Sequence, residues 1–321
     1  MTFSFNKTEY TIVFAGQVYN IDDLKEELIS QNFELETHSD TEILLKSYIY
    51  FGESIVSKLN GIFSFAIWNN KSKNIFIARD QLGIMPLYYY KTNDIFIFST
   101  DIKAILKHSI IFNNISIEKY PLNSNTDSHI AKTIFNNIYE LLPANSILYQ
   151  KGTIYFNQYW KANTKFLMED IESTYNNVYK LTENALKHQL VSDVPFCLFL
   201  SNPYTYKLLV KYALNHCQNK HIRKLNVYVL HCMDSNFQSL EVNLADNINS
   251  IFQTDINIII NTIFIDNCSK DSVLDTICKA IKQEYNICIF DTAIDKLFRV
   301  NEIYNIKFIQ KIFKTARNMR S

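Results

Sequence analysis

The chain has 321 residues, which is enough for two domains that each bury a core. Hydrophobic residues make up 47% of it and charged residues 20%, which is ordinary for a globular protein, and 32 basic residues balance 32 acidic ones. A formal charge of zero gives no indication of a nucleic-acid partner or of an anionic membrane, and we expect neither.

The cysteines and the apolar stretches indicate the cellular compartment in which the chain is expected. All six cysteines follow residue 196, namely Cys197, Cys217, Cys232, Cys268, Cys278 and Cys288. The even spacing of the last three allows a metal site, but the absence of a C-x-x-C pair and of a histidine at ligand spacing favours buried free thiols in a reducing cytosol. No signal peptide is visible, and the longest apolar stretch, residues 256–265, is too short to span a bilayer. We predict a buried strand there and a cytoplasmic protein.

The first half opens with a predicted strand and a predicted helix. Residues 10–15, YTIVFA, have the apolar character of a strand. Residues 20–29 place Leu24 and Leu28 on one helical face, behind an N-cap at Asn20.

A stronger helix signal lies in residues 38–52. Ser39 and Glu42 have the spacing of a capping box, and Gly52 suits the end of a helix. Three large side chains follow the box at helical spacing, namely Leu44, Tyr48 and Phe51.

Short aromatic-rich strands follow, over residues 62–68, 74–80, 87–90 and 95–99. A polar turn joins the first two, which indicates antiparallel pairing. The next predicted elements are a helix over 101–108, an irregular stretch over 109–130 and a hairpin over 146–160. The first half is therefore predicted to be α+β, with antiparallel sheet.

The second half changes character. A predicted helix over 171–190 turns five side chains inward, namely Ile171, Tyr175, Val178, Ala185 and Leu186. Predicted strands at 194–200, 225–230, 256–265 and 287–290 then alternate with predicted helices at 205–216, 240–252 and 272–284. This alternation predicts a parallel α/β sheet, and we divide the chain into domains 1–165 and 166–321.

The order of several motifs points to a known family. THSDTEILLKSY, LNGIFSFAIW and IFIARDQLGIMPLYYY follow the first strand, and YELLPANSILY, QYW and LVSDVPFCLFLS extend into the second half. Together they resemble the glutamine-hydrolysing asparagine synthetases, with a likeness that fades after about residue 240. Within the third motif, Arg79 and Asp80 are predicted to form a structural pair at the end of a strand.

The resemblance implies both fold and chemistry. The first domain would be an incomplete N-terminal-nucleophile-type sandwich of two antiparallel sheets, in which a free N-terminal cysteine attacks the side-chain amide of glutamine. The second would be an incomplete, doubly wound, adenine-nucleotide α-hydrolase-like domain. There the family adenylates aspartate with ATP and Mg²⁺, and ammonia displaces AMP.

Several positions depart from the family's glutaminase pattern. Thr2 follows the first methionine where the family has its cysteine, and it is out of register, so no catalytic nucleophile is expected. The family's N-G-E reads Ala15-Gly16-Gln17, which loses an amide donor to the oxyanion and a carboxylate for the substrate's amino group. Gly16 keeps its backbone N–H. Asp40 is either the surviving amino-group ligand or a first-turn acid that the helix dipole favours.

The family's phosphate loop, S-G-G-x-D-S-S, aligns with residues 201–207, SNPYTYK. Both glycines that would cradle pyrophosphate are replaced, and the proline has no N–H to donate. Ser201 and Thr205 are the remaining candidate nucleotide contacts of this degenerate loop, Thr205 in place of a magnesium-placing aspartate. A plain turn, with Asn202 as N-cap and Pro203 as first helical residue, fits the same residues better.

A second synthetase motif aligns with the run that begins ICIFDTAIDKLF. It keeps Asp295 and Phe298 but has Asp291 and its neighbours in place of S-G-E, so no metal site is predicted from it.

We therefore expect an asparagine-synthetase-like protein of impaired activity, with no cofactor predicted beyond the ATP and Mg²⁺ of the family. The family substrates would be glutamine and aspartate. Three alternatives remain open: a partner or regulator of a full-length synthetase, an ATP-dependent amide ligase with an altered site, and a small-molecule sensor that uses the Asp40 pocket. Lack of the opening strand would leave a sheet edge exposed, which predicts a homodimer or aggregation.

Overall fold

A computed structural model describes residues 1–37, 39–112, 116, 130–162, 170–189, 196–200, 206–232, 256–265 and 287–290. The chain divides into two compact units, residues 1–166 and 167–321, and each is described by itself. The helices predicted at 240–252 and 272–284 lie outside the described residues.

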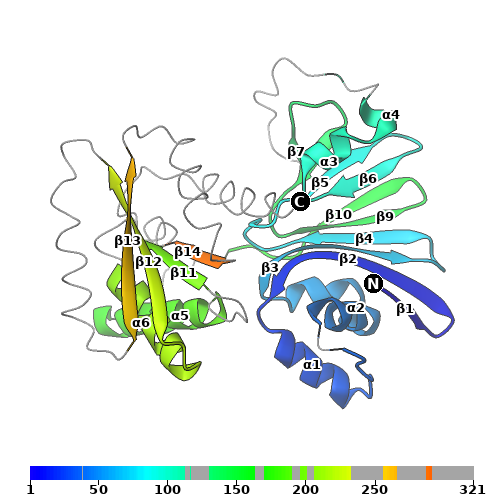
Figure 1. Ribbon diagram of the computed structural model, residues 1–321. Helices are drawn as coiled ribbons and strands as arrows, with labels where there is room; N and C mark the ends of the chain where they lie inside the picture. The colour runs from blue at the N-terminus through cyan, green and yellow to red at the C-terminus, as the bar shows by residue number, and fades with distance from the viewer. Residues whose placement is uncertain are drawn as a thin grey trace. The chain divides into compact units, whose positions relative to one another are not determined.

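Two antiparallel sheets form the first unit (Figure 1). The larger has the order β1-β2-β3-β4-β9-β10, with β1 Thr2–Phe5, β2 Thr8–Val18, β3 Gly61–Asn69, β4 Asn74–Arg79, β9 Asn145–Gln150 and β10 Thr153–Gln158. The smaller has the order β6-β5-β8-β7, with β5 Tyr88–Lys91, β6 Phe96–Ser99, β7 Ile130–Lys132 and β8 Ile138–Leu141. The predicted antiparallel strands and the hairpin over 146–160 are confirmed.

The helices of the first unit are short. They are α1 Ile21–Ser30, α2 Asp40–Phe51, a 3₁₀ turn Gly52–Ser57, α3 Ile102–Leu106 and α4 Ser109–Phe112. The stretch predicted to be irregular therefore starts with a helical turn. The predicted side-chain cap at Asn20 is wrong, because the Asn20 carboxamide instead binds the backbone of Lys58 and Asn60 at 2.9 and 2.8 Å.

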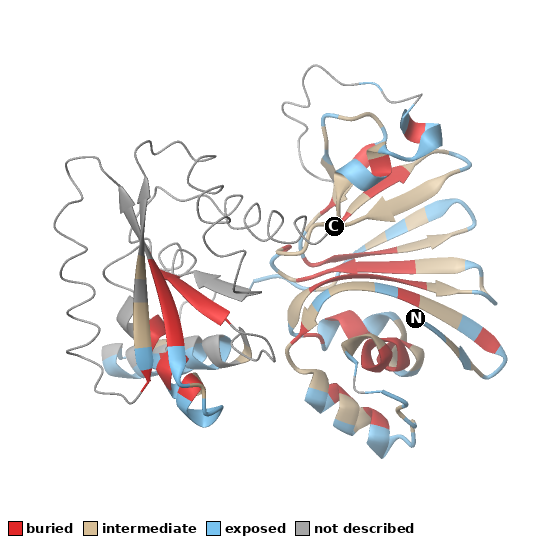
Figure 2. Ribbon diagram, in the orientation of Figure 1, coloured by how far each residue is buried: buried red, intermediate tan, exposed pale blue. Residues whose placement is uncertain are grey.

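The larger sheet buries both of its faces over the central strands, as Figure 2 shows. One face packs against α1 and α2, where Leu24, Leu28 and Leu44 meet the phenylalanines of β3 and β4. The other face meets the smaller sheet through Ala66, Ile77 and Tyr89, among others. Successive side chains of β3 and β4 point to opposite faces of the larger sheet. These two strands therefore contribute both to the core under α1 and α2 and to the core between the two sheets.

β1 folds back on β2 as a tight hairpin and covers the start of its outer edge. The register pairs Thr2 with Thr11 and Phe5 with Thr8, and Asn6 and Lys7 form the turn. The sheet edge that was expected to be exposed is therefore covered in part, because TFSF supplies a strand that the sequence pattern does not reveal. Beyond Ile12, the outer edge of β2 has no strand partner among the described residues.

Among the residues that the structure describes, the second unit contains a sheet of four parallel strands in the order β13-β12-β11-β14. They are β11 Phe196–Leu200, β12 Lys224–Cys232, β13 Asn257–Ile265 and β14 Ile287–Phe290, and the helices are α5 Ile171–Gln189 and α6 Tyr206–Asn219. The parallel pairing confirms the predicted α/β sheet.

Two details of the second unit differ from the sequence prediction. Ala185 is exposed on α5 rather than turned inward. The strand predicted over 256–265 is confirmed as β13, but it is not buried throughout: Ile256 is buried, Asn257 is exposed and Ile258 is half-buried, and among the described strands β13 pairs with β12 alone. None of the described helices combines the length and the hydropathy that a membrane crossing needs.

Candidate functional site

The predicted site residues of the first unit gather at the end of β2. Gly16 pairs with Phe63 across β2 and β3 and has φ +130°. A Cβ atom at Gly16 would lie 2.0 Å from the carbonyl oxygen of Ile62. The close approach of the two backbones therefore requires glycine at this position whatever its role toward a ligand.

Asp40 meets the same end of β2 from the first turn of α2. Its Oδ2 accepts a hydrogen bond from the Val18 N–H at 3.3 Å, and the residue is half-buried. Gly16 and Asp40 are thus brought to the same strand end. The position fits both interpretations of Asp40, a first-turn acid at a helix N-terminus and a carboxylate beside an uncovered strand edge.

Ala15 and Gln17 lie on the opposite face of β2 from the helices. Ile12, Phe14 and Val18 pack toward α1 and α2, so the alternate residues face the smaller-sheet side. Ala15 and Gln17 are both half-buried there, in register with Ser64 and Ile62. Ala15 supplies only a methyl group to this surface.

The turn that precedes Asp40 is held by a buried carboxylate. Glu42 Oε1 accepts from the Glu36 N–H at 2.7 Å, Oε2 accepts from the Thr37 N–H at 2.6 Å, and the Thr37 hydroxyl donates to Oε2 as well. Lys46, one turn further along α2, donates to Glu42 Oε1 at 2.6 Å. Burial raises the pKa of Glu42, but the hydrogen bonds from Lys46, Thr37 and the backbone outweigh it and lower this pKa to about 2.

The predicted capping box is therefore only half present. The Ser39 hydroxyl accepts from the Glu42 N–H at 3.3 Å, as predicted. The Glu42 side chain, however, binds the turn at Glu36 and Thr37. The sequence does not predict this network. Its one indication of a buried ion pair is Lys46, which follows Glu42 by four residues inside an otherwise apolar helix.

Arg79 and Asp80 each brace the loop after β4. The Asp80 carboxylate accepts from the N–H groups of Leu82, Ile84 and Met85 at 2.9 to 3.1 Å. Burial raises the pKa of Asp80, while these bonds and the nearby Arg79 oppose the rise. Asp80 is 1% exposed, which marks it as a structural anchor.

The Arg79 guanidinium binds other groups than the carboxylate beside it. Nε donates to Met85 O at 2.9 Å, Nη2 to Gly83 O at 2.7 Å, and Nη1 to both Leu141 O and Glu140 Oε1, the latter at 2.9 Å. Arg79 forms its ion pair with Glu140, and its charge also opposes the rise in the pKa of Asp80. Both residues keep the structural role that was expected.

The candidate residues of the second unit fall largely outside the described residues. Ser201 and Thr205 lie in the undescribed segment between β11 and α6, and Asp291 and Asp295 follow β14 in another. β11 lies between β12 and β14, so the chain passes to opposite sides of β11 in reaching its two neighbours. In the part of the chain that is described, no group of three or more histidine, cysteine, aspartate or glutamate side chains is placed to hold a metal ion.

Comparison with known proteins gives one family match and several relatives. The glutamine amidotransferase domain family matches residues 2–160. Asparagine synthetase [glutamine-hydrolyzing] 3 of Bacillus subtilis is 35% identical over 232 residues, which are 71% of this chain and 38% of that protein. Asparagine synthetase [glutamine-hydrolyzing] 1 of the same organism is 32% identical over 221 residues, 65% of this chain and 33% of that protein.

The similarity to solved structures is weaker. Glutamine phosphoribosylpyrophosphate amidotransferase of B. subtilis, complexed with ADP and GMP, aligns with a TM-score of 0.38 at 15% identity and covers 69% of this chain and 46% of that chain. The chain spans about a third of the length of the two curated relatives named above, 38% of one and 33% of the other.

Proposed function

From the premise that the chain belongs, as a partial member, to the glutamine-hydrolysing asparagine synthetase family, we propose that it is an asparagine-synthetase-like protein whose glutamine chemistry is impaired. The family reaction is the ATP-dependent amidation of aspartate with ammonia from glutamine. The proposal concerns the first step of that reaction, release of ammonia from the glutamine side chain.

The observation that carries the proposal is the make-up of the β2 end. Asp40 binds the backbone of Val18, two residues after Gly16 on the same strand, and this position supports a remnant of the family's amino-acid site. Ala15 offers no amide to a developing oxyanion, and a lost donor of this kind costs about 10²- to 10³-fold in rate. Gln17 offers no negative charge to a substrate ammonium group, so ground-state binding is weakened as well.

Glutamine binding, measured by calorimetry, tests the proposal without requiring turnover. We expect the unaltered chain to give no saturable heat at millimolar glutamine. The Ala15→Asn, Gln17→Glu double variant should give saturable heat at millimolar glutamine, because it restores the donor and the carboxylate that the family pattern has at these positions.

Val13→Asn serves as the matched control. Val13 lies on the same face of β2, two residues before Ala15, and is 55% exposed, so an amide there should leave glutamine binding unchanged. Release of glutamate from glutamine by the unaltered chain, abolished in Asp40→Asn, would overturn the proposal.

The strand order of the second unit favours one alternative, an ATP-dependent amide ligase with an altered site. Ligands of open α/β sheets bind beyond the carboxyl ends of the strands at the point where the chain switches direction across the sheet. The junction of β11 and β14 is such a point, and it supports a search for nucleotide beside Ser201 and Thr205. Micromolar binding of ATP with Mg²⁺, lost in Thr205→Val, would favour this alternative; no binding at millimolar ATP would remove it.

A further inference from the structure

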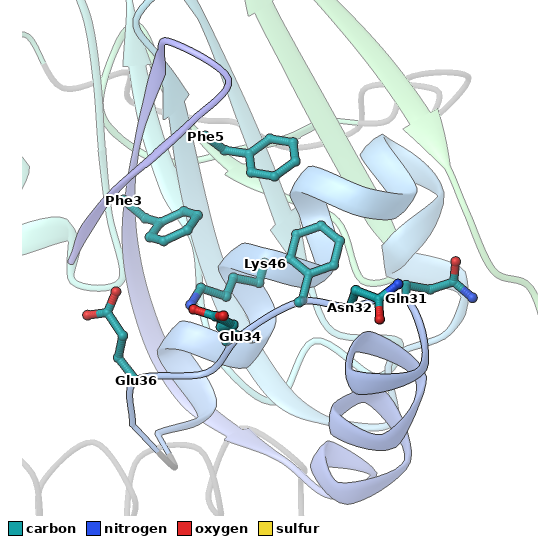
Figure 3. A pocket seen from close by; sticks show the side chains of 8 residues that line it. Phe3, Phe5, Gln31, Asn32, Glu34, Glu36 and Lys46 are labelled. Carbon is teal, nitrogen blue, oxygen red and sulfur yellow. The ribbon is translucent and has the colours of Figure 1, made fainter.

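A cavity of about 450 Å³ opens between β1 and the loop that follows α1. Its volume is in the range of small-molecule sites. Figure 3 shows Phe3 and Phe5 projecting from β1 and Lys46 from α2, with Glu34 and Glu36 on the loop opposite. Neither Gly16 nor Asp40 lines this cavity, so it is a separate site from the one at the end of β2.

Aromatic rings form the apolar wall. Phe5 and Phe33 stack with their centroids 5.5 Å apart and their planes 20° apart. Phe33 also meets Tyr50 edge to face, with centroids 5.9 Å apart. Because β1 contributes two of the three rings that line the cavity, the wall exists only where the hairpin closes over the loop.

The one lysine of the lining does not offer its charge to a ligand. Lys46 is 2% exposed, and its ammonium group donates to Glu42 Oε1 and to the Glu34 carbonyl oxygen, both at 2.6 Å. The Phe3 ring covers the same nitrogen with its centroid at 4.4 Å. A ligand carboxylate would therefore find the Lys46 charge already paired with Glu42, two of its three N–H donors engaged and the same nitrogen covered by the Phe3 ring.

The accessible charge of the lining is negative. Glu34 and Glu36 are exposed, and both residues use backbone atoms for their hydrogen bonds to Lys46 and Glu42. We propose that this cavity binds a small organic amine, with the ammonium group toward Glu34 and Glu36 and the apolar or aromatic body against Phe5 and Phe33. Aromatic rings and carboxylates together recognise ammonium groups that carry an apolar body.

Three probes of nearly equal size test the proposal: 2-phenylethylamine, 2-phenylethanol and phenylacetate. Binding to the full chain is followed by NMR titration. We expect the amine to bind most tightly, the alcohol more weakly and the anion most weakly. We also expect the preference for the amine to fall as salt rises from about 0.01 M to about 1 M, where the Debye length shortens from about 30 Å to about 3 Å.

Single variants separate the contribution of the two glutamates to amine binding from the contribution of the aromatic wall. Glu34→Gln and Glu36→Gln should each weaken amine binding about two- to fivefold, as expected for partly exposed ion pairs, and should leave the alcohol unaffected. Both variants keep the backbone atoms that bind Lys46 and Glu42, so the fold is expected to persist. Phe33→Ala should weaken the amine and the alcohol alike.

Glu26→Gln is the matched control, because Glu26 is an exposed glutamate on α1 that does not line the cavity. It should leave the affinities of all three probes unchanged. Equal affinity for the three probes, tightest binding of phenylacetate, or no binding of the amine to a chain of unchanged near-ultraviolet circular dichroism would each overturn the proposal.

Discussion

Lys46 Nζ lies 2.6 Å from Glu42 Oε1, and both side chains are withdrawn from water, with 2% and 0% of their surface exposed. The two residues are one helical turn apart on α2. Their charges are paired with each other, and the remaining acceptor positions of Glu42 are filled by the turn at Glu36 and Thr37. This pair therefore connects the helix, the turn and the wall of the cavity in one network.

Removing one member of the buried pair should strongly destabilise the first unit. In Lys46→Met the Glu42 carboxylate stays buried without its cation, and such losses typically cost about 3 to 5 kcal/mol. We expect the free energy of unfolding, measured in urea, to fall by about this amount. The double variant Glu42→Gln, Lys46→Met should lose less than the single one, because no uncompensated charge remains.

Lys58 provides the control for that measurement. Its ammonium group lies 2.9 Å from Glu27 Oε1, but the two side chains are 44% and 39% exposed. A surface pair of this kind contributes about 0 to 1 kcal/mol, so Lys58→Met should change stability little. Equal decreases in the free energy of unfolding in Lys46→Met and Lys58→Met would show that the buried ion pair stabilises the chain no more than the surface pair does.

The free energy of unfolding should depend on pH through the ionisation of Glu42. Its pKa is about 2 in the folded chain against an ordinary value of 4.5, so the folded state favours the ionised form. The resulting stability, about 3 kcal/mol, is fully present above pH 4.5 and is lost as the pH falls toward 2. Denaturant titrations across this window should give a shallower slope in Glu42→Gln than in the unaltered chain, and parallel slopes would contradict the assignment.

The effect of Gly16→Ala should be structural before it is functional. The new methyl group would lie 2.0 Å from Ile62 O on a backbone with φ +130°, which combines overlap with strain, and we expect a loss of about 3 kcal/mol or more. Gly52→Ala is the comparison, because a Cβ there would meet no atom within 4 Å, so only the backbone strain of φ +63° and ψ −145° is added, about 1 to 3 kcal/mol. Thermal melts of the two variants measure the difference; equal melting temperatures would show that β2 and β3 can separate at no cost.

The aromatic alternation of the first half is enough to predict its antiparallel strands, because each strand buries a period-two pattern that is visible locally. β1 escapes such reasoning, since TFSF is short and its turn has no glycine. The inward face of α5 is misassigned at Ala185, because a long polar helix with few apolar residues does not define one face by spacing alone.

The candidate site is only partly predictable for a similar reason. The resemblance points to Gly16 and Asp40, and their meeting at the end of β2 follows from the helix that begins at Asp40. The second role of Glu42 depends on the turn at residues 34–37 folding back onto α2, and the cavity depends on β1 closing over that turn. Neither contact is encoded by spacing along the chain, since each joins segments that only tertiary structure brings together.

The two tight hairpins of the larger sheet offer a matched test of turn chemistry. Asn6 and Lys7 join β1 to β2 with φ of 49° and 61°, and Lys151 and Gly152 join β9 to β10 with φ of 49° and 80°. Two-residue turns of this type need positive φ at both positions, where glycine is unstrained and lysine is not. Lys7→Gly should remove about 1 to 2 kcal/mol of backbone strain. Part of this is offset because glycine has more conformational entropy in the unfolded chain, so we expect the free energy of unfolding to rise by about 0.5 to 1 kcal/mol.

The reverse substitution completes that comparison. Gly152→Lys introduces the same strain at the equivalent position and should lower stability by about the amount that Lys7→Gly raises it. Melting temperatures should therefore shift in opposite directions, by about 2 to 4 °C per kcal/mol for a unit of this size. A loss in Gly152→Lys without a gain in Lys7→Gly would mean that Lys7 makes a compensating contact, and the hairpin that walls the cavity would then be held by more than its pairing with β2.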